Sequence, residues 1–386
     1  MSDTVSVFVN GRRFSGWKSV HIEMGIEQVA RAFALQVTEK LPGQLSFSSF
    51  QSGSVVEIYI GSDLVCTGYV TSTPVSYNGN SVTVAIQGKS KTVDLVDCCP
   101  PAAATKSASS DGWAGVKGKS GKAVSAPSQV ATSWKEQPTS KILAALTSAY
   151  GITVRDEVGA GDKLANHTVN PGETVVESIN RLIAKDNLLV TDDEKGNLVI
   201  TEPGAGGSCS DALVLGENIL SGKADFDFSK RFSTYTVLGQ HKQQDTDDSK
   251  TASSDKGEVT DAEVKRYRLK VIKDSGQSSI ELCKRRADYT MRYTRAQSQK
   301  ATYTVQGWRQ KNGVLWPLNS TVCVTDPVLG FSQARFVVSR LSFDLSNKGA
   351  LTSIECCDPD GLARDPKQSG SGSTSTWQGV KKLNAN

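Results

Sequence analysis

Residues 55–97 carry the stretch that decides the fold: VVEIYIGSDLVCTGYVTSTPVSYNGNSVTVAIQGKSKTVDLVD. The dipeptide Asn78-Gly79 is typical of a tight hairpin, because both central positions of a type I′ turn need positive φ. Apolar residues alternate at period two on both sides of it, as in half-buried strands: Val56, Ile58, Ile60, Val82, Val84 and Ile86. The stretch therefore predicts consecutive antiparallel strands of a small barrel or sandwich.

Residues 320–357 repeat this order of strands in the segments STVCV, ARFVVSRL and ALTSIECC. Asn347-Lys348-Gly349 takes the place of the Asn-Gly turn. The spacings nearly match, because 22 residues separate Val56 from Asn78 and 23 separate Val324 from Asn347. Two interpretations fit: a chance likeness between all-β segments, or a duplicated barrel within one chain.

The 386 residues agree with two to four domains at ~150 residues per domain. We expect a first β-barrel domain at 1–97, completed by 211–240. Residues 98–210 hold a mobile loop and a small α+β module, and 241–357 form a second β-barrel domain with a long helix. Residues 358–386, rich in Pro, Ser, Gly and Thr, are expected to form a disordered tail. The fold class is thus α+β, mainly β, with two tube-like antiparallel barrels and an inserted module.

Helices and loops are expected between the strand-rich segments. Residues 102–133 combine Ser, Gly, Lys and Ala with few large apolar side chains, which predicts a mobile loop. Apolar stripes at helical spacing predict helices over 139–150, 173–185 and 278–297. A hairpin is expected at 188–201. The polar stretch 241–261 is expected to be a loop.

Composition narrows the function classes. The chain has 44 basic and 40 acidic residues, a net charge of +4, which is too balanced for nucleic-acid binding by bulk charge. No run of 18 apolar residues occurs, so membrane insertion is not expected. The N-terminus MSDTVSVFVNGRR has no basic start followed by an apolar run, so we expect no signal peptide and synthesis in a reducing cytoplasm.

Residue types that carry chemistry lack the spacing of a catalytic or metal site. The three histidines, His21, His167 and His241, have no nucleophile-elbow Ser or Cys beside them. Cys98-Cys99 and Cys356-Cys357 are adjacent pairs, and neighbouring strand residues point to opposite faces, so one pair cannot clamp zinc. We expect no catalytic residue, no cofactor and no metal.

Two further motifs are incomplete. Gly118-Lys119-Ser120 resembles the end of a phosphate-binding loop, but Trp113 stands where that loop needs its first glycine. Asp245, Asp247 and Asp248 lack the glycine and terminal glutamate of a calcium loop. Both stretches are expected to be solvated loops.

A basic region with interspersed tyrosines lies in the second half of the chain. Three interpretations stay open for it: a solvated face, a protein–protein contact, or nucleic-acid binding, which aromatic interleaving favours and nearby acidic residues oppose. Its residues are Lys265, Arg266, Arg268, Lys270, Lys273, Lys284, Arg285, Arg286, Arg292 and Arg295, with Tyr267, Tyr289 and Tyr293.

Taken in order, several stretches resemble the Mu-like contractile phage baseplate central hub proteins, the tail protein P family. The likeness covers roughly residues 1–357 and is specific as a set. This sequence differs from the family at the loop 102–133, which resembles an insertion, and in the tail after Asp358, which is not recognisably shared. The stretches are TVSVFVNGRRFSGWKSVHIEMGIEQVARAFALQV, LVCTGY at 64–69, GKSKTVDLVDC at 88–98, ETV at 173–175, LVLGEN at 213–218 and RFSTYTV at 231–237.

The resemblance implies a structural late protein of the virion, assembled in the host cytoplasm into the tail baseplate. It implies a homotrimeric ring that adapts the sixfold tail tube to the threefold central spike and leaves a channel for genome ejection. The implied partners are the central tail spike protein, the tail tube protein or tube initiator, and other baseplate proteins. No sequence-specific nucleic-acid binding is implied.

Other functions are weighed against the hub. A type VI secretion or phage-tail-like bacteriocin spike would use a related hub. A tail-associated cell-wall hydrolase would need paired carboxylates in a cleft or a zinc site, and the sequence supplies neither clearly. A DNA-binding protein would use the basic region.

Overall fold

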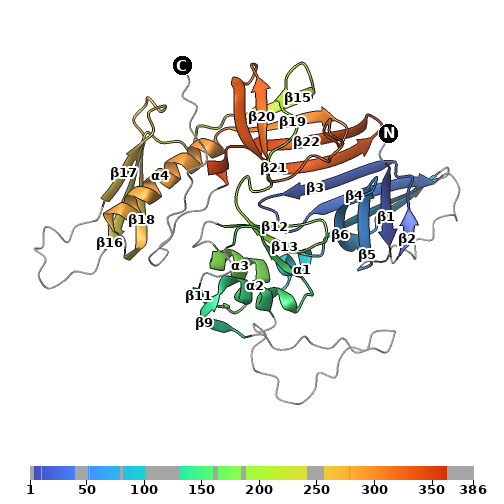
Figure 1. The fold of residues 1–386 in the computed structure, drawn as a ribbon, viewed down its shortest axis with the longest axis horizontal. Helices are drawn as coiled ribbons and strands as arrows, with labels where there is room; N and C mark the ends of the chain where they lie inside the picture. The colour runs from blue at the N-terminus through green and yellow to red at the C-terminus, as the bar shows by residue number, and fades with distance from the viewer. Residues whose placement is uncertain are drawn as a thin grey trace, which may run out of the picture. The chain divides into compact units, whose positions relative to one another are not determined.

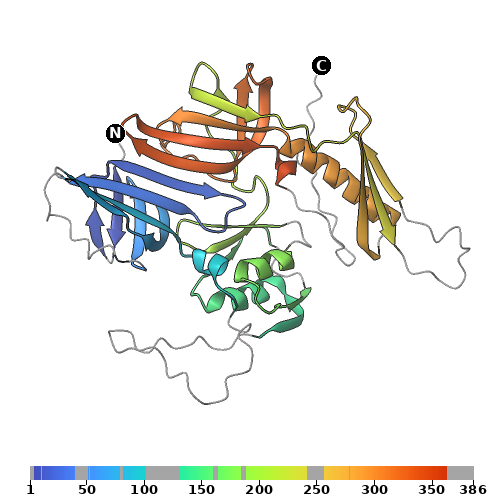
Figure 2. The same ribbon diagram turned by 180° about the vertical axis from the view of Figure 1, so that it is seen from behind.

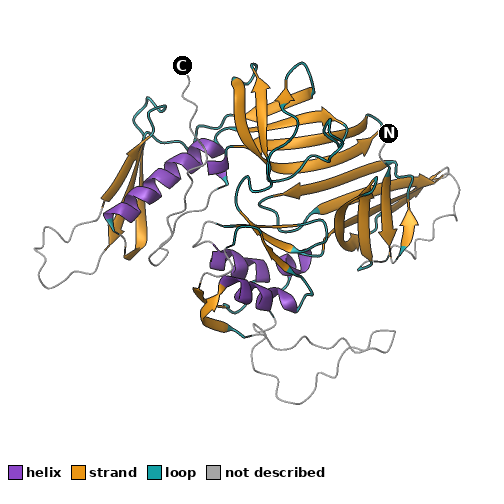
Figure 3. Ribbon diagram, viewed as in Figure 1, coloured by secondary structure: helices purple, strands orange, loops and turns teal. Residues whose placement is uncertain are grey.

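The structure is a computed structural model, and it describes residues 4–9, 11–39, 51, 53–78, 81–100, 131–159, 164–183, 188–240, 256–277 and 279–362 (Figure 1). The chain divides into two compact units. The larger comprises the described residues up to Arg231 and those from Arg292 onward, and the smaller comprises those between Phe232 and Met291. Strands dominate the larger unit (Figure 3).

The first barrel is antiparallel, with strand order β3-β4-β8-β6-β5-β1-β2 and β7 beside β8. The predicted alternation is present, since Val56, Ile58 and Ile60 are fully buried on one face of β5. A short helix, α1 (Val93–Asp97), follows the last strand. The strands are β1 (Val5–Val9), β2 (Arg12–Phe14), β3 (Ser19–Gly25), β4 (Ala32–Glu39), β5 (Val55–Ile60), β6 (Asp63–Ser72), β7 (Val75–Asn78) and β8 (Ser81–Ser90).

The second barrel has the order β15-β19-β22-β21-β20-β14. An isolated bridge between Leu215 and Ile219 brings β14 back to the start of β15, which closes the circuit. A 3-10 helix (Pro359–Gly361) follows the last strand. The strands are β14 (Leu213–Val214), β15 (Ile219–Asp225), β19 (Lys300–Gln306), β20 (Thr321–Asp326), β21 (Phe331–Ser346) and β22 (Gly349–Cys357).

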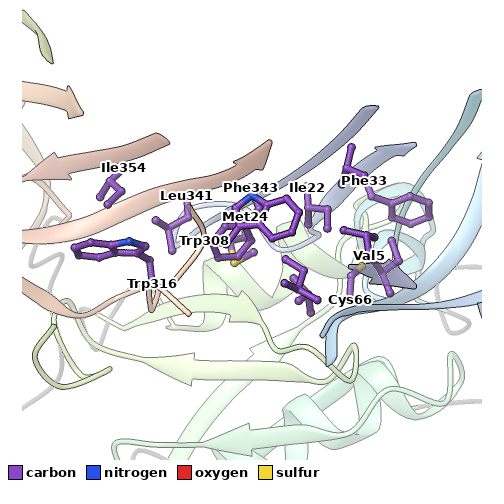
Figure 4. Packing of buried hydrophobic residues seen from close by; sticks show 14 of the residues in the cluster. Val5, Ile22, Met24, Phe33, Cys66, Trp308, Trp316, Leu341, Phe343 and Ile354 are labelled. Carbon is purple, nitrogen blue, oxygen red and sulfur yellow. The ribbon is translucent and has the colours of Figure 1, made fainter. Parts of the chain in front are cut away.

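The two barrels share one 14-stranded sheet, because β3 of the first pairs antiparallel with β21 of the second. They also share one hydrophobic core. Figure 4 shows Ile22, Met24 and Phe343 between the apolar side chains of the two barrels. Burial of a side chain of this size stabilises the fold by roughly 1.5–3 kcal/mol, so this core helps to hold the barrels together.

The inserted module packs two helices against short sheets, and both helices are visible from behind in Figure 2. Helix α3 (Val175–Ile183) begins at a capping box, in which Thr174 Oγ1 accepts from the Glu177 N–H and the Glu177 carboxylate accepts from the Thr174 N–H. The other elements are β9 (Ser133–Pro138), α2 (Thr139–Ser148), β10 (Val154–Asp156), β11 (Leu164–Thr168), β12 (Leu189–Asp192) and β13 (Leu198–Thr201).

The smaller unit is a three-stranded sheet of β16 (Thr234–Gln240), β17 (Lys256–Thr260) and β18 (Leu269–Gln277). The part of α4 (Ile280–Gln297) up to Met291 packs on this sheet. Gly257 permits this packing, because a Cβ there would lie 2.2 Å from the backbone of Cys283. The expected loop at 241–261 is wrong at its end, since 256–260 pair with β16. Its first part, to 255, lies outside the described residues.

Three expected boundaries differ from the structure. Residues 211–240 do not complete the first barrel, because β14 and β15 pair with β20 and β19 of the second barrel and β16 pairs in the smaller unit. Residues 256–291 belong to the smaller unit and not to the second barrel. The tail does not begin at Asp358, since Leu362 is buried beside Ile26. The loop 102–133 lies outside the described residues as far as 130, and Ser133 opens β9.

Candidate functional site: the junction between the two barrels

The junction is a six-residue antiparallel ladder between β3 and β21. Ile22 lies opposite Phe343, and these two side chains point into the shared core. Because successive strand residues point to opposite faces, His21 opposite Asp344 and Glu23 opposite Ser342 lie on the outer face. Figure 1 shows β3 and β21 side by side.

The outer face of the junction carries paired charges. His21 Nδ1 lies 2.6 Å from Asp344 Oδ1, and Arg340 Nη1 donates to Glu23 Oε1 at 2.7 Å. The hydrogen bond to Asp344 raises the pKa of His21, and partial burial opposes that rise. Exposed pairs of this kind contribute about 0–1 kcal/mol each, so they help to specify the strand register more than they add stability.

The strands around the junction repeat those of the first barrel residue by residue. In the first barrel, β6 is followed by β7, and both pair with β8; in the second, the single long strand β21 pairs with β22. Each pairing has a bulge, between Val70 and Ser72 in one and between Val338 and Arg340 in the other. From these bulges to the hairpins, the same number of residues separates each position of β6, β7 and β8 from its equivalent in β21 and β22. The hairpins are equivalent too, because Asn78 pairs with Ser81 in one and Ser346 pairs with Gly349 in the other.

A buried ion pair attaches the module to the first barrel. Arg31 Nε donates to Asp192 Oδ1 at 3.1 Å, with side-chain exposures of 11% and 1%. The same guanidinium donates to the carbonyls of Val65 and Asp192, and the Arg31 N–H donates to Asp192 Oδ2. Burial raises the pKa of the Asp192 carboxyl, and the charge of Arg31 counteracts this. Such a network fixes orientation, because every buried charge has its partners.

A second contact reaches both barrels from the module. Leu189 of β12 packs with Ile26 after β3, with Val337 of β21 and with Cys357 and Leu362 at the end of the second barrel. Thr191 Oγ1 donates to the Gly25 carbonyl at 3.2 Å. The hairpin β12–β13 therefore contacts both barrels beside their junction and helps to hold them together.

The three histidines, for which no catalytic site was predicted, lie in different parts of the chain. His21 lies at the junction, and His167 is buried, with Nε2 2.8 Å from Ser178 Oγ and its ring stacked on Trp134. His241 lies outside the described residues, as do Gly118-Lys119-Ser120 and the aspartates 245, 247 and 248. Within the described ranges no three His, Cys, Asp or Glu side chains gather as metal ligands would.

Three of the cysteines that lie in strands, Cys66, Cys356 and Cys357, are buried among apolar side chains. Cys356 and Cys357 are buried, Cys98 is half-buried and Cys99 is exposed, and no described cysteine forms a disulfide. Burial raises the pKa of both Cys66 and Cys357 to about 12. A thiol that stays protonated is a poor nucleophile and metal ligand.

The basic region is divided between the two units. The Arg268 guanidinium and the Lys270 ammonium lie over the Phe232 ring, at 4.8 and 5.5 Å from its centroid. Arg292, in the larger unit, pairs with Asp360 at 3.4 Å. No helix in the described part of the chain is both long and apolar enough to cross a bilayer.

Four family models match successive parts of the chain. They are the Mu phage baseplate assembly protein GpP-like N-terminal domain at residues 4–90, the second domain of baseplate hub protein gp44-like proteins at 124–202, the third domain of NMB1110-like tail proteins at 231–291, and the fourth domain of GpP at 279–365. Fold and matches together define the class: a baseplate hub protein of a contractile phage tail.

The chain belongs to the family of the Mu phage baseplate hub protein gp44. It is 31% identical to "Baseplate hub protein gp44" of Escherichia phage Mu over 358 residues, 91% of this chain and 86% of that protein. The 43 kDa tail protein of prophage MuSo2 from Shewanella oneidensis has 26% identity and a TM-score of 0.76, covering 93% of this chain and 99% of that one. The tail protein of Neisseria meningitidis MC58 shares the fold at 20% identity and a TM-score of 0.69, covering 94% and 100%.

These matches confirm the resemblance and the fold class expected from the sequence. They indicate no enzyme family. The junction ladder and the buried Arg31–Asp192 pair were not predicted, because their partners lie 323 and 161 residues apart. The alternation of Val20, Ile22 and Met24 with His21 and Glu23 was a signal for β3 that could have been used.

Proposed function

We propose that the chain forms a homotrimeric ring that adapts the sixfold tail tube to the threefold central spike. The duplicated barrel carries this proposal. Three chains with two barrels each supply six similar units, while the chains themselves keep closed threefold symmetry. One side of the ring would meet the tail tube protein or tube initiator, and the other would meet the central spike protein, with other baseplate proteins around it.

The ring leaves a channel through which DNA passes during ejection. The near balance of 44 basic and 40 acidic residues suits passage without sequence-specific binding. The protein has a structural role and no enzymatic activity. It is assembled in the host cytoplasm and resides in the virion baseplate.

The test is the mass of the full-length protein in solution, alone and with its spike protein. We expect three chains in the complex with the spike. A chain that stays monomeric in the presence of the spike protein would contradict the ring. Hydrolysis of cell-wall material would favour the hydrolase, and salt-dependent DNA affinity would favour a DNA-binding role.

A hub of a type VI secretion or bacteriocin spike is the nearest alternative. The identity of 31% to the hub of Escherichia phage Mu favours the phage baseplate. Capsid and terminase genes beside the coding sequence would agree with the phage, and their absence would favour the alternative.

A further inference from the structure

Strands β7 and β15 each leave one edge without a partner strand among the described residues. Strand β7 pairs only with β8, and β15 pairs along residues 221–225 only with β19. Val75 and Tyr77 of β7 are 47% and 84% exposed. An apolar edge left open in this way invites pairing with another chain.

The internal duplication indicates which kind of strand could pair with the open edge of β7. By the constant spacing described above, Val75 is equivalent to Phe343, Ser76 to Asp344 and Tyr77 to Leu345. Phe343 is 2% exposed in the core that it shares with Ile22 of the neighbouring strand β3, whereas Val75, which has no such neighbour on its open side, is 47% exposed. The β7 edge therefore lacks the strand that β3 supplies to β21.

The strand equivalent to β3 in the second barrel is β15. Val37 of β4 pairs with Val84, and Val305 of β19 pairs with Thr352, so β4 and β19 are equivalent at the same spacing. Next along the sheet, β3 pairs with β4 as β15 pairs with β19.

These ladders align β15 with β3 residue by residue. Glu23 pairs with Ala32 as Asp225 pairs with Lys300. Lys223 therefore takes the place of His21, and Ala224 takes the place of Ile22.

We propose that β15 of one subunit pairs antiparallel with β7 of the next, in the register with which β3 pairs with β21 inside the chain. Lys223 then lies opposite Ser76, Ala224 opposite Val75 and Gly222 opposite Tyr77. The partner is a second copy of this chain, joined head to tail. This inference rests on the proposed ring and specifies the contact that builds it.

Pro74 does not obstruct this edge. Its carbonyl accepts a hydrogen bond from the Ala85 N–H on β8 at 2.9 Å. In an antiparallel ladder the nitrogen and carbonyl of one residue face the same neighbour. The missing N–H of Pro74 therefore faces β8, while Val75 and Tyr77 present their backbone groups to the open edge.

Engineered disulfides test the register. Opposed residues of antiparallel strands have Cα atoms about 4.5–5.5 Å apart, within the disulfide range of ~4.4–6.8 Å. We expect Ser76→Cys with Lys223→Cys to give covalent dimers and trimers of the full-length protein after mild oxidation. The wild type, each single variant, and Val75→Cys with Lys223→Cys, whose side chains lie on opposite faces, are the controls and should stay uncrosslinked.

Parallel mass measurements separate the two levels of failure. A trimer in which the Ser76/Lys223 pair does not crosslink overturns the strand pairing and leaves the ring standing. A chain that is monomeric at every concentration, with and without the spike protein, overturns the ring and the pairing together. Efficient crosslinking of Ser76→Cys alone, in a chain whose exposed Cys99 is replaced by Ser, would mean that β7 pairs with itself, and would also overturn the proposal.

Charge variants test the same contact without cysteine. Opposite charges across a ladder attract and like charges repel, and each such pair changes a dissociation constant by up to about five-fold. Ser76→Asp, opposite Lys223, should tighten association, and Ser76→Lys should weaken it. Lys223→Asp added to Ser76→Lys should restore it. Equal association of Ser76→Asp and Ser76→Lys, with unchanged Tm, would overturn the proposal.

Discussion

The larger unit contains two connections between distant parts of the sequence, and they are built differently. The module is attached to the first barrel by the buried Arg31–Asp192 pair, whose carboxylate side chain is 1% exposed. The two barrels are attached by a backbone ladder whose charges lie on the surface. A buried charge accepts one partner in one geometry, whereas a strand edge accepts any strand of fitting register. The buried ion pair therefore holds the module at one place within a chain. Pairing of strand edges can also occur between two copies of the chain.

The largest expected effect comes from breaking the buried pair. Arg31→Ala leaves the Asp192 carboxylate without its charged partner and should lower the free energy of unfolding by about 3–5 kcal/mol, as for other broken buried pairs. The measurement is urea unfolding followed by fluorescence. The matched control is Arg340→Ala, which removes an exposed pair with Glu23 and should cost about 0–1 kcal/mol. Equal losses in the two variants would contradict the comparison.

An intermediate effect is expected in the core beneath the ladder. Ile22 is fully buried opposite Phe343, and Ile22→Val removes one methylene and should cost about 0.5–1.5 kcal/mol. The same urea experiment measures it. Because this core is shared, both barrels should lose stability in one transition. Separate transitions for the two barrels would show that the junction does not couple them.

The smallest expected effect is a pH dependence at the ladder. The pKa of His21 is raised in the folded protein by Asp344, so its contribution to stability is fully present below the ordinary His pKa of about 6.5. It is lost as the pH rises through the higher folded-state value. The stability difference between wild type and His21→Gln should therefore shrink across that window, from at most about 1 kcal/mol. A difference that grows with pH would contradict this assignment.

Local patterns in the sequence predicted much of this fold. Alternating apolar residues marked the strands on either side of Asn78-Gly79, and the stripe containing Ile179 and Leu182 marked α3. The polar composition of 241–261 hid β17, because only Gly257 and Val259 break its run of polar residues. The prediction that 211–240 complete the first barrel was wrong for another reason. Tertiary packing determines which strands pair, and the sequence of a single strand does not reveal its partner.

The ladder between β3 and β21 also has a consequence for folding. His21 and Asp344 are 323 residues apart, so during synthesis β3 emerges long before its partner exists. Contacts of such separation are slow to form, and an uncovered strand edge is open to aggregation until they do. An edge of the N-terminal barrel is therefore covered only by the last segment of the fold, and a chain cut before β21 would expose β3 even though the strands of its own barrel are all present.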